Sequence, residues 1–156
     1  MWHDPGMMWW HEVTAREPEF AARVRQRFQK TKQCTLATIR KSGAPRISAT
    51  ELDFAEDELW LGCIAGSVKA RDLRRDPRLA LHCGTIDIPD TRQGAWVGDA
   101  KLAGVAHEFT DPDRPGGSHR FRIAVTEITY LTIAPTEDHL VLETWHPDRG
   151  LRRRRR

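Results

Sequence analysis

The sequence contains few cysteines and no long apolar run. Its three cysteines, Cys34, Cys63 and Cys83, are widely spaced and lie in apolar surroundings. An odd number of such cysteines is typical of buried free thiols in a reducing compartment rather than of a disulfide framework. No apolar run is long enough to cross a membrane, and no signal-peptide pattern is visible at the N-terminus. We therefore expect a cytoplasmic protein without a membrane span.

Metal-ligand and catalytic patterns are missing as well. The seven histidines and three cysteines show neither Cys-x-x-Cys nor His-x-x-x-His spacing, so no metal site is predicted. His82, beside Cys83, is interpreted as a packed histidine of the core or of a sheet edge. No pattern indicates a catalytic acid, base or nucleophile, and the catalytic residues therefore stay unassigned.

Positive charge is concentrated at the C-terminus. The net charge is +3, but residues 152–156 are all arginine, and without them the net charge is −2. The favoured interpretation of residues 151–156 is a solvated, disordered tail. Non-specific contact with nucleic-acid phosphates is the less favoured alternative.

Residues 17–150 carry the patterns of one domain, preceded by an N-terminal arm, residues 1–16. A helix is predicted over residues 18–31, because Phe20, Val24 and Phe28 recur at helical spacing. The period then changes to two or to short apolar runs, which are typical of strands. The predicted strands are residues 34–40, 46–54, 59–64, 78–83, 94–109, 120–133 and 139–145, the first two forming a hairpin.

Short strands with frequent turns predict a mainly β fold with flanking helices, closed or half-closed as an antiparallel barrel. Gly98 and Gly104 are expected at bends or bulges of the long segment 94–109. In the arm, Trp9 and Trp10 are expected to pack on the barrel, because an exposed tryptophan pair favours association.

One face of the segment 46–54 begins polar and becomes apolar. Arg46, Ser48 and Thr50 precede Leu52 and Phe54 on the same face, because strand side chains alternate. Such a face either lines a ligand cleft or merely reaches solvent at its polar end.

The stretch "GSVKARDLRRDPR", residues 66–78, begins a short helix. Ser67 is a candidate N-cap, and the free N–H groups of the first turn then suit an anion such as phosphate. Lys69 can fold over that anion, with Arg71 nearby. The alternative is a short exposed helix, and this solvated reading is kept for Arg74 and Arg75.

Three segments together resemble the pyridoxamine 5′-phosphate oxidase-like, flavin-binding split-barrel superfamily, in particular its flavin- and deazaflavin-dependent oxidoreductases. They are "CTLATIRKSGAPRISATELDF", "ELWLGCIAGSVKARDLRRDPRLALHC" and "LETWHPDRG". The resemblance implies a six-stranded antiparallel split β-barrel and a homodimer with cofactor clefts at its interface. It also implies an FMN-dependent oxidoreductase acting on a small organic substrate. The alternatives are dependence on coenzyme F420, whose acidic tail suits Arg71, Arg74 and Arg75, and cofactor or haem binding without turnover.

The resemblance further implies the cofactor-binding residues. Ser67 and Lys69 are phosphate ligands, and Arg71 is a possible contact further out. Trp145 reaches into the cleft of the other subunit. Arg46, Ser48 and Thr50 belong to the strand that lines the phosphate and the ring. Gly62, Cys63 and Ile64 end another strand and flank the ring through backbone groups.

The chain also departs from the oxidases of the vitamin itself. Those enzymes carry a cation where this chain has Val68 and a lysine where it has Glu51. Their C-terminal substrate motif pairs arginine with histidine, whereas "RGLRRRRR" contains no histidine. These differences argue against oxidation of the vitamin.

Overall fold

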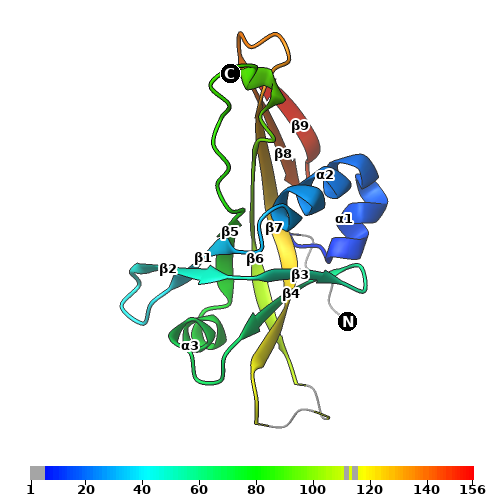
Figure 1. Cartoon of the computed structure of the whole chain (residues 1–156). Helices are drawn as coiled ribbons and strands as arrows, with labels where there is room; N and C mark the ends of the chain where they lie inside the picture. The colour runs from blue at the N-terminus through cyan, green and yellow to red at the C-terminus, as the bar shows by residue number, and fades with distance from the viewer. Residues whose placement is uncertain (1–5, 111–112, 114–115) are drawn as a thin grey trace.

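The computed structural model describes residues 6–110, 113 and 116–156. In the sequence, two helices precede all the strands, and a third helix lies between the fourth and fifth strands (Figure 1). No helix in this part of the chain is long and apolar enough to cross a membrane. The elements are α1 (Trp10–Arg16), α2 (Pro18–Gln29), β1 (Cys34–Ile39), β2 (Pro45–Thr50), β3 (Leu52–Ala55), β4 (Glu58–Cys63), α3 (Val68–Arg75), β5 (Arg78–His82), the short 3-10 helix η1 (Gln93–Ala95), β6 (Asp99–Phe109), β7 (His119–Ile133), β8 (Leu140–His146) and β9 (Gly150–Arg155).

A single residue joins the two edge strands of the barrel. The order of the sheet is β2-β1-β5-β6-β7-β4-β3, with antiparallel pairing throughout. β2 pairs with β1 at one end of this path, and β3 pairs with β4 at the other. Glu51 alone separates β2 from β3 in the sequence. The two ends of the path are therefore held together covalently, and the sheet is an open antiparallel barrel.

The described residues contain nine strands, whereas the resemblance implied six. The predicted strand 46–54 is divided at Glu51, because its first half follows β1 and its second half follows β4. Beyond the path that closes at Glu51, β8 pairs with β7, and β9 pairs with β8. The sheet thus extends past the barrel as a β8–β9 hairpin, which carries the C-terminus (Figure 1).

The two glycines of the predicted segment 94–109 occupy positions that exclude a side chain. A Cβ at Gly104 would lie 2.5 Å from the carbonyl oxygen of Ala124, and the β6–β7 register shifts between Ala103 and Gly104. Gly98 has φ +79°, and a Cβ there would lie 2.4 Å from the oxygen of Leu131. Both glycines therefore serve as the expected bend and bulge, and the strand itself begins later than predicted, at Asp99.

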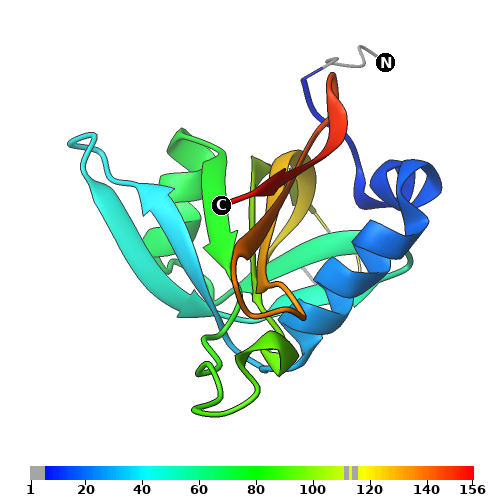
Figure 2. The same ribbon diagram turned by 90° about the horizontal axis from the view of Figure 1, so that it is seen from above.

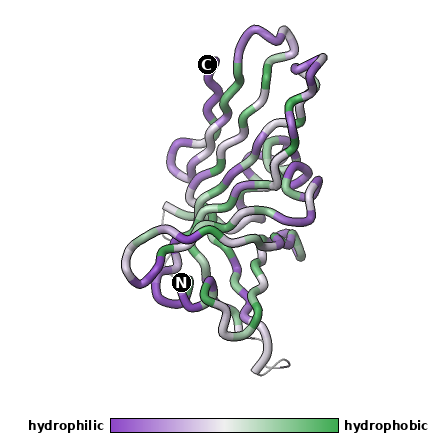
Figure 3. Tube along the Cα trace, turned by 60° about the vertical axis from the view of Figure 1, so that its left-hand side comes forward, coloured by the Kyte–Doolittle hydropathy of each residue, from purple (hydrophilic) through white to green (hydrophobic). Residues whose placement is uncertain are grey.

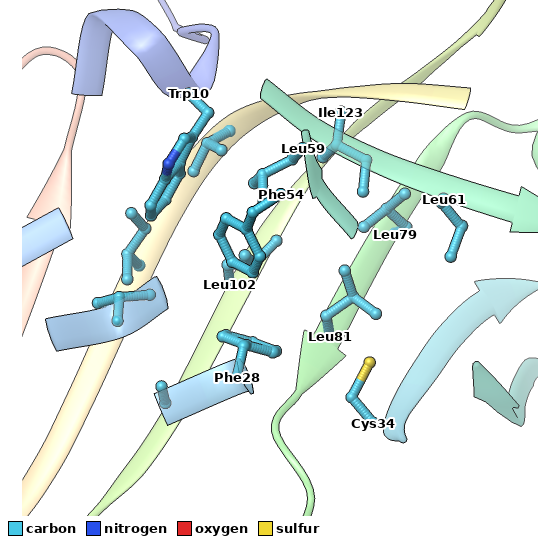
Figure 4. Close-up of a cluster of buried hydrophobic side chains, with 14 of the residues drawn as sticks. Trp10, Phe28, Cys34, Phe54, Leu59, Leu61, Leu79, Leu81, Leu102 and Ile123 are labelled. Atoms are coloured by element: carbon cyan, nitrogen blue, oxygen red, sulfur yellow. The ribbon is translucent and has the colours of Figure 1, made fainter. Parts of the chain in front are cut away.

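The two N-terminal helices cover one side of the barrel, opposite the β1–β2 hairpin and α3 (Figures 1 and 2). The predicted helix 18–31 is α2, whose buried face holds Phe20, Val24 and Phe28. Phe28 and Phe54 both lie in the central core, with ring centroids 6.3 Å apart (Figure 4). The helical periodicity of the sequence thus identified the buried face correctly.

The N-terminal arm is more ordered than expected. Residues 1–5 lie outside the described part, but α1 is a helix, and its Trp10 and Val13 are fully buried. The Trp10 ring meets Phe54 edge-on at 5.3 Å (Figure 4), so packing of Trp10 on the barrel is confirmed. Met8 is also buried and pairs through its backbone with Val125. The sequence lacked a helical period here because the segment is short.

The C-terminal tail is not disordered. Residues up to Arg155 form β9, with Val141 opposite Arg155 and Trp145 opposite Leu151. The expectation of solvent exposure holds, since residues 152–156 are exposed. The segment is ordered because its backbone pairs with β8 and Leu151 packs against the core. Its composition alone had indicated a tail.

Replacing Trp10 by alanine should lower the free energy of unfolding by about 3–5 kcal/mol, because it empties a fully buried site. Urea denaturation followed by circular dichroism measures the loss. Trp9→Ala is the matched control, since this neighbouring ring packs edge-on against His107 without full burial. Equal losses in the two variants would contradict the assignment of α1 to the core.

Candidate functional site

Helix α3 begins with a structured turn. Gly66 has φ +70°, a conformation that favours glycine, and a Cβ there would meet no atom within 4 Å. The Ser67 hydroxyl accepts a hydrogen bond from the Ala70 N–H at 3.4 Å, which confirms Ser67 as the N-cap. The other N–H groups of the first turn lack intrahelical partners, as at every helix start. The turn therefore has the geometry that binds anions in many proteins.

An open cavity of about 580 Å³ lies beside this turn. Its volume lies within the range of small-molecule sites. Lys69 reaches it from α3, with its Nζ atom donating a hydrogen bond to the Ala49 oxygen at 2.9 Å. The lining comes from β2, β3, β4, β7, α3 and the flanking loops: Gln33, Ala49, Thr50, Glu51, Asp53, Trp60, Gly62, Ile64, Lys69, Ser118, His119 and Arg120.

Two lining residues carry buried polar atoms without a partner among the described residues. They are the Oγ1 atom of Thr50 and the Nε1 atom of Trp60. Unpartnered buried polar groups are costly, and each one in a native structure calls for an explanation. A Cβ at Gly62 would meet nothing within 4 Å, so this part of the wall is open to a flat ring. These features fit a phosphate-bearing aromatic cofactor.

The comparison with known families gives a direct result. A sequence profile described as "Pyridoxamine 5'-phosphate oxidase" matches residues 20–132. The chain belongs to this family. A search of curated protein sequences finds no match.

Several solved structures share this fold. A pyridoxamine 5′-phosphate oxidase-related, FMN-binding protein from Nostoc punctiforme is 14% identical with a TM-score of 0.60, covering 88% of this chain and 95% of the other. PhzG from Burkholderia lata, in complex with tetrahydrophenazine-1-carboxylic acid, is 12% identical with a TM-score of 0.63, covering 93% and 91%. HutZ, the haem storage protein from Vibrio cholerae, is 15% identical with a TM-score of 0.54, covering 78% and 98%. At these identities the likeness concerns the fold alone.

The structure brings some of the residues implied by the family resemblance to the cavity. Thr50, Gly62, Ile64 and Lys69 line it, and Ser67 caps the helix at its edge. Ser48 is half-buried on β2 and is not part of the lining. The polar beginning of the segment 46–54 thus reaches the cavity at its inner end, Thr50.

Arg46 is held by a protein carboxylate. Its Nε atom lies 2.6 Å from Oδ2 of Asp72, whose side chain is only 4% exposed. Thr38 donates a hydrogen bond to the same oxygen at 2.9 Å, and Arg75 contacts the other oxygen at 2.9 Å. Arg46 therefore fixes α3 to β2, and Arg75, which the sequence analysis assigned to a solvated face, takes part in the same cluster.

Three other implied residues point away from the cavity. Arg71 folds back, and its guanidinium donates to the Gly66 oxygen at 3.0 and 3.1 Å. Cys63 is buried on the core side of β4, where burial raises the pKa of its thiol. Trp145 is 1% exposed within the core of its own chain, so its ring is not presented to another subunit.

The sequence analysis missed the β7 side of the cavity. The Arg120 guanidinium lies 3.8 Å from the centre of the Trp60 ring. The Nδ1 atom of His119 lies 2.9 Å from Glu108, and its Nε2 atom accepts a hydrogen bond from the Gly66 N–H at 3.2 Å. His119 thus braces the turn that precedes α3. Only the pairing of β7 with β4 reveals these neighbours, and sequence spacing gave no signal for it.

One cluster has the residue types of a metal site. The ligand atoms of His82, Cys83 and Asp99 lie within 4.8 Å of one another. However, the buried guanidinium of Arg27 lies 3.6 Å from Asp99 and already places a positive charge there. Burial also raises the pKa of the Cys83 thiol, which disfavours the thiolate that a metal requires. We therefore assign no metal to this cluster.

Replacing Asp72 by asparagine should lower the free energy of unfolding by about 3 kcal/mol at pH 7, because it leaves two arginines without their buried partner. Burial acts to raise the pKa of Asp72, but hydrogen bonds from Arg46, Arg75 and Thr38 outweigh it, so the pKa lies below its usual value. A lowered pKa stabilises the fold above the unfolded value of about 4, and this contribution is lost as the pH falls through the folded value.

Urea denaturation of the wild type and Asp72→Asn from pH 7 down to pH 3 measures this effect. The two stabilities should converge as the pH falls. Asp57→Asn is the control, because Asp57 is exposed in the turn between β3 and β4 and asparagine also tolerates its φ of 59°. A difference that stays constant with pH would exclude the charge of Asp72 as its cause.

Proposed function

We propose that the chain is an FMN-dependent oxidoreductase acting on a small organic substrate, with catalytic residues still unassigned. The carrying observation is the convergence of three features at one cavity: the capped start of α3, the Lys69 ammonium group and the unpartnered Thr50 hydroxyl. The first two are suited to a phosphate, and the third suits a polar edge of the ring. Family membership supports a flavin independently.

The protein's part is to bind and orient. When bound, FMN supplies hydride or electron transfer at its ring. Lys69 would neutralise the phosphate, held in place by its hydrogen bond to Ala49. Gly62 would let the ring approach the β4 backbone, and His119 would keep the α3 turn in its binding conformation through Gly66.

The substrate is not expected to be the phosphorylated vitamin. Val68 supplies no second cation at the start of α3, and it is half-exposed. Glu51 and Asp53 add negative charge to the lining, with Lys32 lying 3.5 Å from Glu51. A second phosphate dianion would meet this acidic wall, so a substrate without a phosphate is favoured.

Coenzyme F420 is the alternative cofactor. The three arginines expected to hold its acidic tail already have partners within the protein, which argues against it. Arg71 donates to the Gly66 oxygen, Arg74 lies 3.0 Å from Glu108, and Arg75 contacts Asp72. Haem binding without turnover is less well supported by the cavity. His119 is the histidine of its lining, and both of its ring nitrogens already have protein partners.

Replacing Lys69 by alanine should weaken FMN binding by about 10- to 100-fold, because a charged hydrogen bond to the phosphate is lost. Val68→Lys should strengthen binding by about threefold, by adding a cation one residue earlier. Lys41→Ala is the matched control, since Lys41 lies in the exposed β1–β2 turn.

Flavin fluorescence and visible absorbance, recorded during titration with FMN, F420 or haem, provide the measurement. Tighter binding of F420 or haem than of FMN would replace the proposed cofactor. Binding of FMN that Lys69→Ala leaves unchanged would remove the cavity as its site. Turnover with a nicotinamide donor then separates an oxidoreductase from a simple binding protein.

We further propose that the chain is a homodimer. Its support is an apolar surface hollow of about 330 Å³ on the outer face of β2, β1, β5 and β6, where Ile47, Ala37, Ala80 and Ala103 lie side by side across the strands. Ile47 is 75% exposed, a large apolar side chain in the same row as small ones on the outside of the sheet. The cofactor cavity is also open, which leaves room for a second subunit to complete it.

Replacing Ile47 by arginine should convert the dimer to a monomer in sedimentation velocity experiments, because a charge would be buried at the interface. Ile88→Arg is the control, since Ile88 is exposed in the loop before η1. A dimer that survives Ile47→Arg would place the interface elsewhere.

A further inference from the structure

The alternate arginines of β9 lie on opposite faces of the sheet. Arg152 is opposite Thr144 and Arg154 is opposite Leu142 on β8, and these residues share the outer face. Arg153 lies opposite Glu143 on the other face. A run of identical residues thus becomes two surfaces of different character, because a strand reverses its side chains at every residue.

The inner face is neutralised in part by acidic residues. Glu143 is buried and binds the guanidinium of Arg23 at 2.7 and 2.9 Å. Arg155 lies 3.0 Å from Asp138. On this face, therefore, Arg155 has an ion pair, whereas Arg153 lies opposite a carboxylate that Arg23 already binds.

The outer face is not neutralised in this way. A shallow groove of about 240 Å³ crosses β8 and β9, and no aspartate or glutamate is among the residues that line it. Arg149 at its edge lies 3.6 Å from Asp148, which leaves three arginines without an ion pair among the described residues. The hydrophilic colour of the chain towards the C-terminus in Figure 3 follows this strand. The basic lining consists of His146, Arg149, Arg152, Arg154 and Arg156.

We propose that this outer face, defined by Arg152, Arg154 and Arg156, binds the phosphate backbone of duplex nucleic acid without sequence preference. Alternate residues of a strand are about 6.8 Å apart, so the three arginines span about 14 Å. Phosphates on one strand of a duplex rise about 3.4 Å each along the axis, so this span matches several of them. The guanidinium group also suits bidentate contact with phosphate.

Other occupants fit the face less well. Single-stranded nucleic acid is held largely by stacking on aromatic side chains, and the groove is lined by no Trp, Tyr or Phe. A second copy of β9 would bring arginine against arginine at the sheet edge. An acidic peptide added along β9 would face arginines on both sides, of which the inner ones already have acidic neighbours. The unpaired charge on one exposed face favours a rigid polyanion.

The test uses fluorescence anisotropy with a labelled 20-base-pair duplex of mixed sequence. Three phosphate contacts predict that affinity falls about 40-fold between 50 and 200 mM salt. The double variant Arg152→Ala, Arg154→Ala should weaken binding at least tenfold at 50 mM salt and flatten the salt dependence by about two contacts.

The matched control is the double variant Arg153→Ala, Arg155→Ala, which removes the same charge from the opposite face of the same strand. Its affinity should stay within about threefold of the wild type. Circular dichroism and thermal unfolding check that both variants keep the fold.

Two results would overturn the proposal. Equal losses in the two double variants would mean that the arginines act as a charged tail without a defined face. Failure of the duplex to bind, together with binding of a labelled hexaglutamate peptide, would make the partner an acidic protein segment instead. Neither result bears on FMN binding, which is measured separately with Lys69→Ala.

Discussion

The buried carboxylate of Asp72 holds the two halves of the candidate site together. It points from α3 into the β1–β2 hairpin, where Thr38 and Arg46 bind one of its oxygens. Without these contacts α3 would be attached to the sheet mainly by Ala70 and Leu73. Lys69, three residues earlier, and the N-cap Ser67, five residues earlier, would then lose their fixed distance from Thr50 on β2. A residue outside the cavity thus determines whether the cavity can bind an anion.

The placement of the cations along α3 is also relevant to anion binding. Cations near a helix start oppose the positive end of the helix dipole. Arg74 and Arg75 lie in the last turn of α3, where the dipole favours positive charge, and Arg71 turns back onto the Gly66 carbonyl. Only Lys69 is directed towards the cavity. Two cations thus lie at the start of the helix, Lys69 and Arg71, and Lys69 is the one that a phosphate in the cavity would compensate.

How well each feature could be predicted depends on how far apart in the sequence the interacting residues are. The helix 18–31 and most strand positions were predictable, because local periodicity records which face is buried. So was Ser67 as N-cap, since capping involves residues three apart. The division at Glu51 and the helix α1 were not, because pairing partners and the burial of Trp10 are set by distant segments. The cavity likewise includes His119 and Arg120, which only β4–β7 pairing brings to Gly62.

Arg46, Trp145 and the arginines of β9 show the limit of transferring roles by sequence position. The residue type at a motif position determines which groups its side chain can bind. The direction in which the side chain points depends on the nearest competing partner in the fold. Arg46 has Asp72 within 2.6 Å and is already bound, and Trp145 fills the core beside Ile128. In β9 the backbone pairing itself sorts five identical residues, giving some of them an acidic neighbour and leaving others open to solvent. A run of arginines can form a specific binding surface only where strand geometry places some of them on one face and the others on the opposite face.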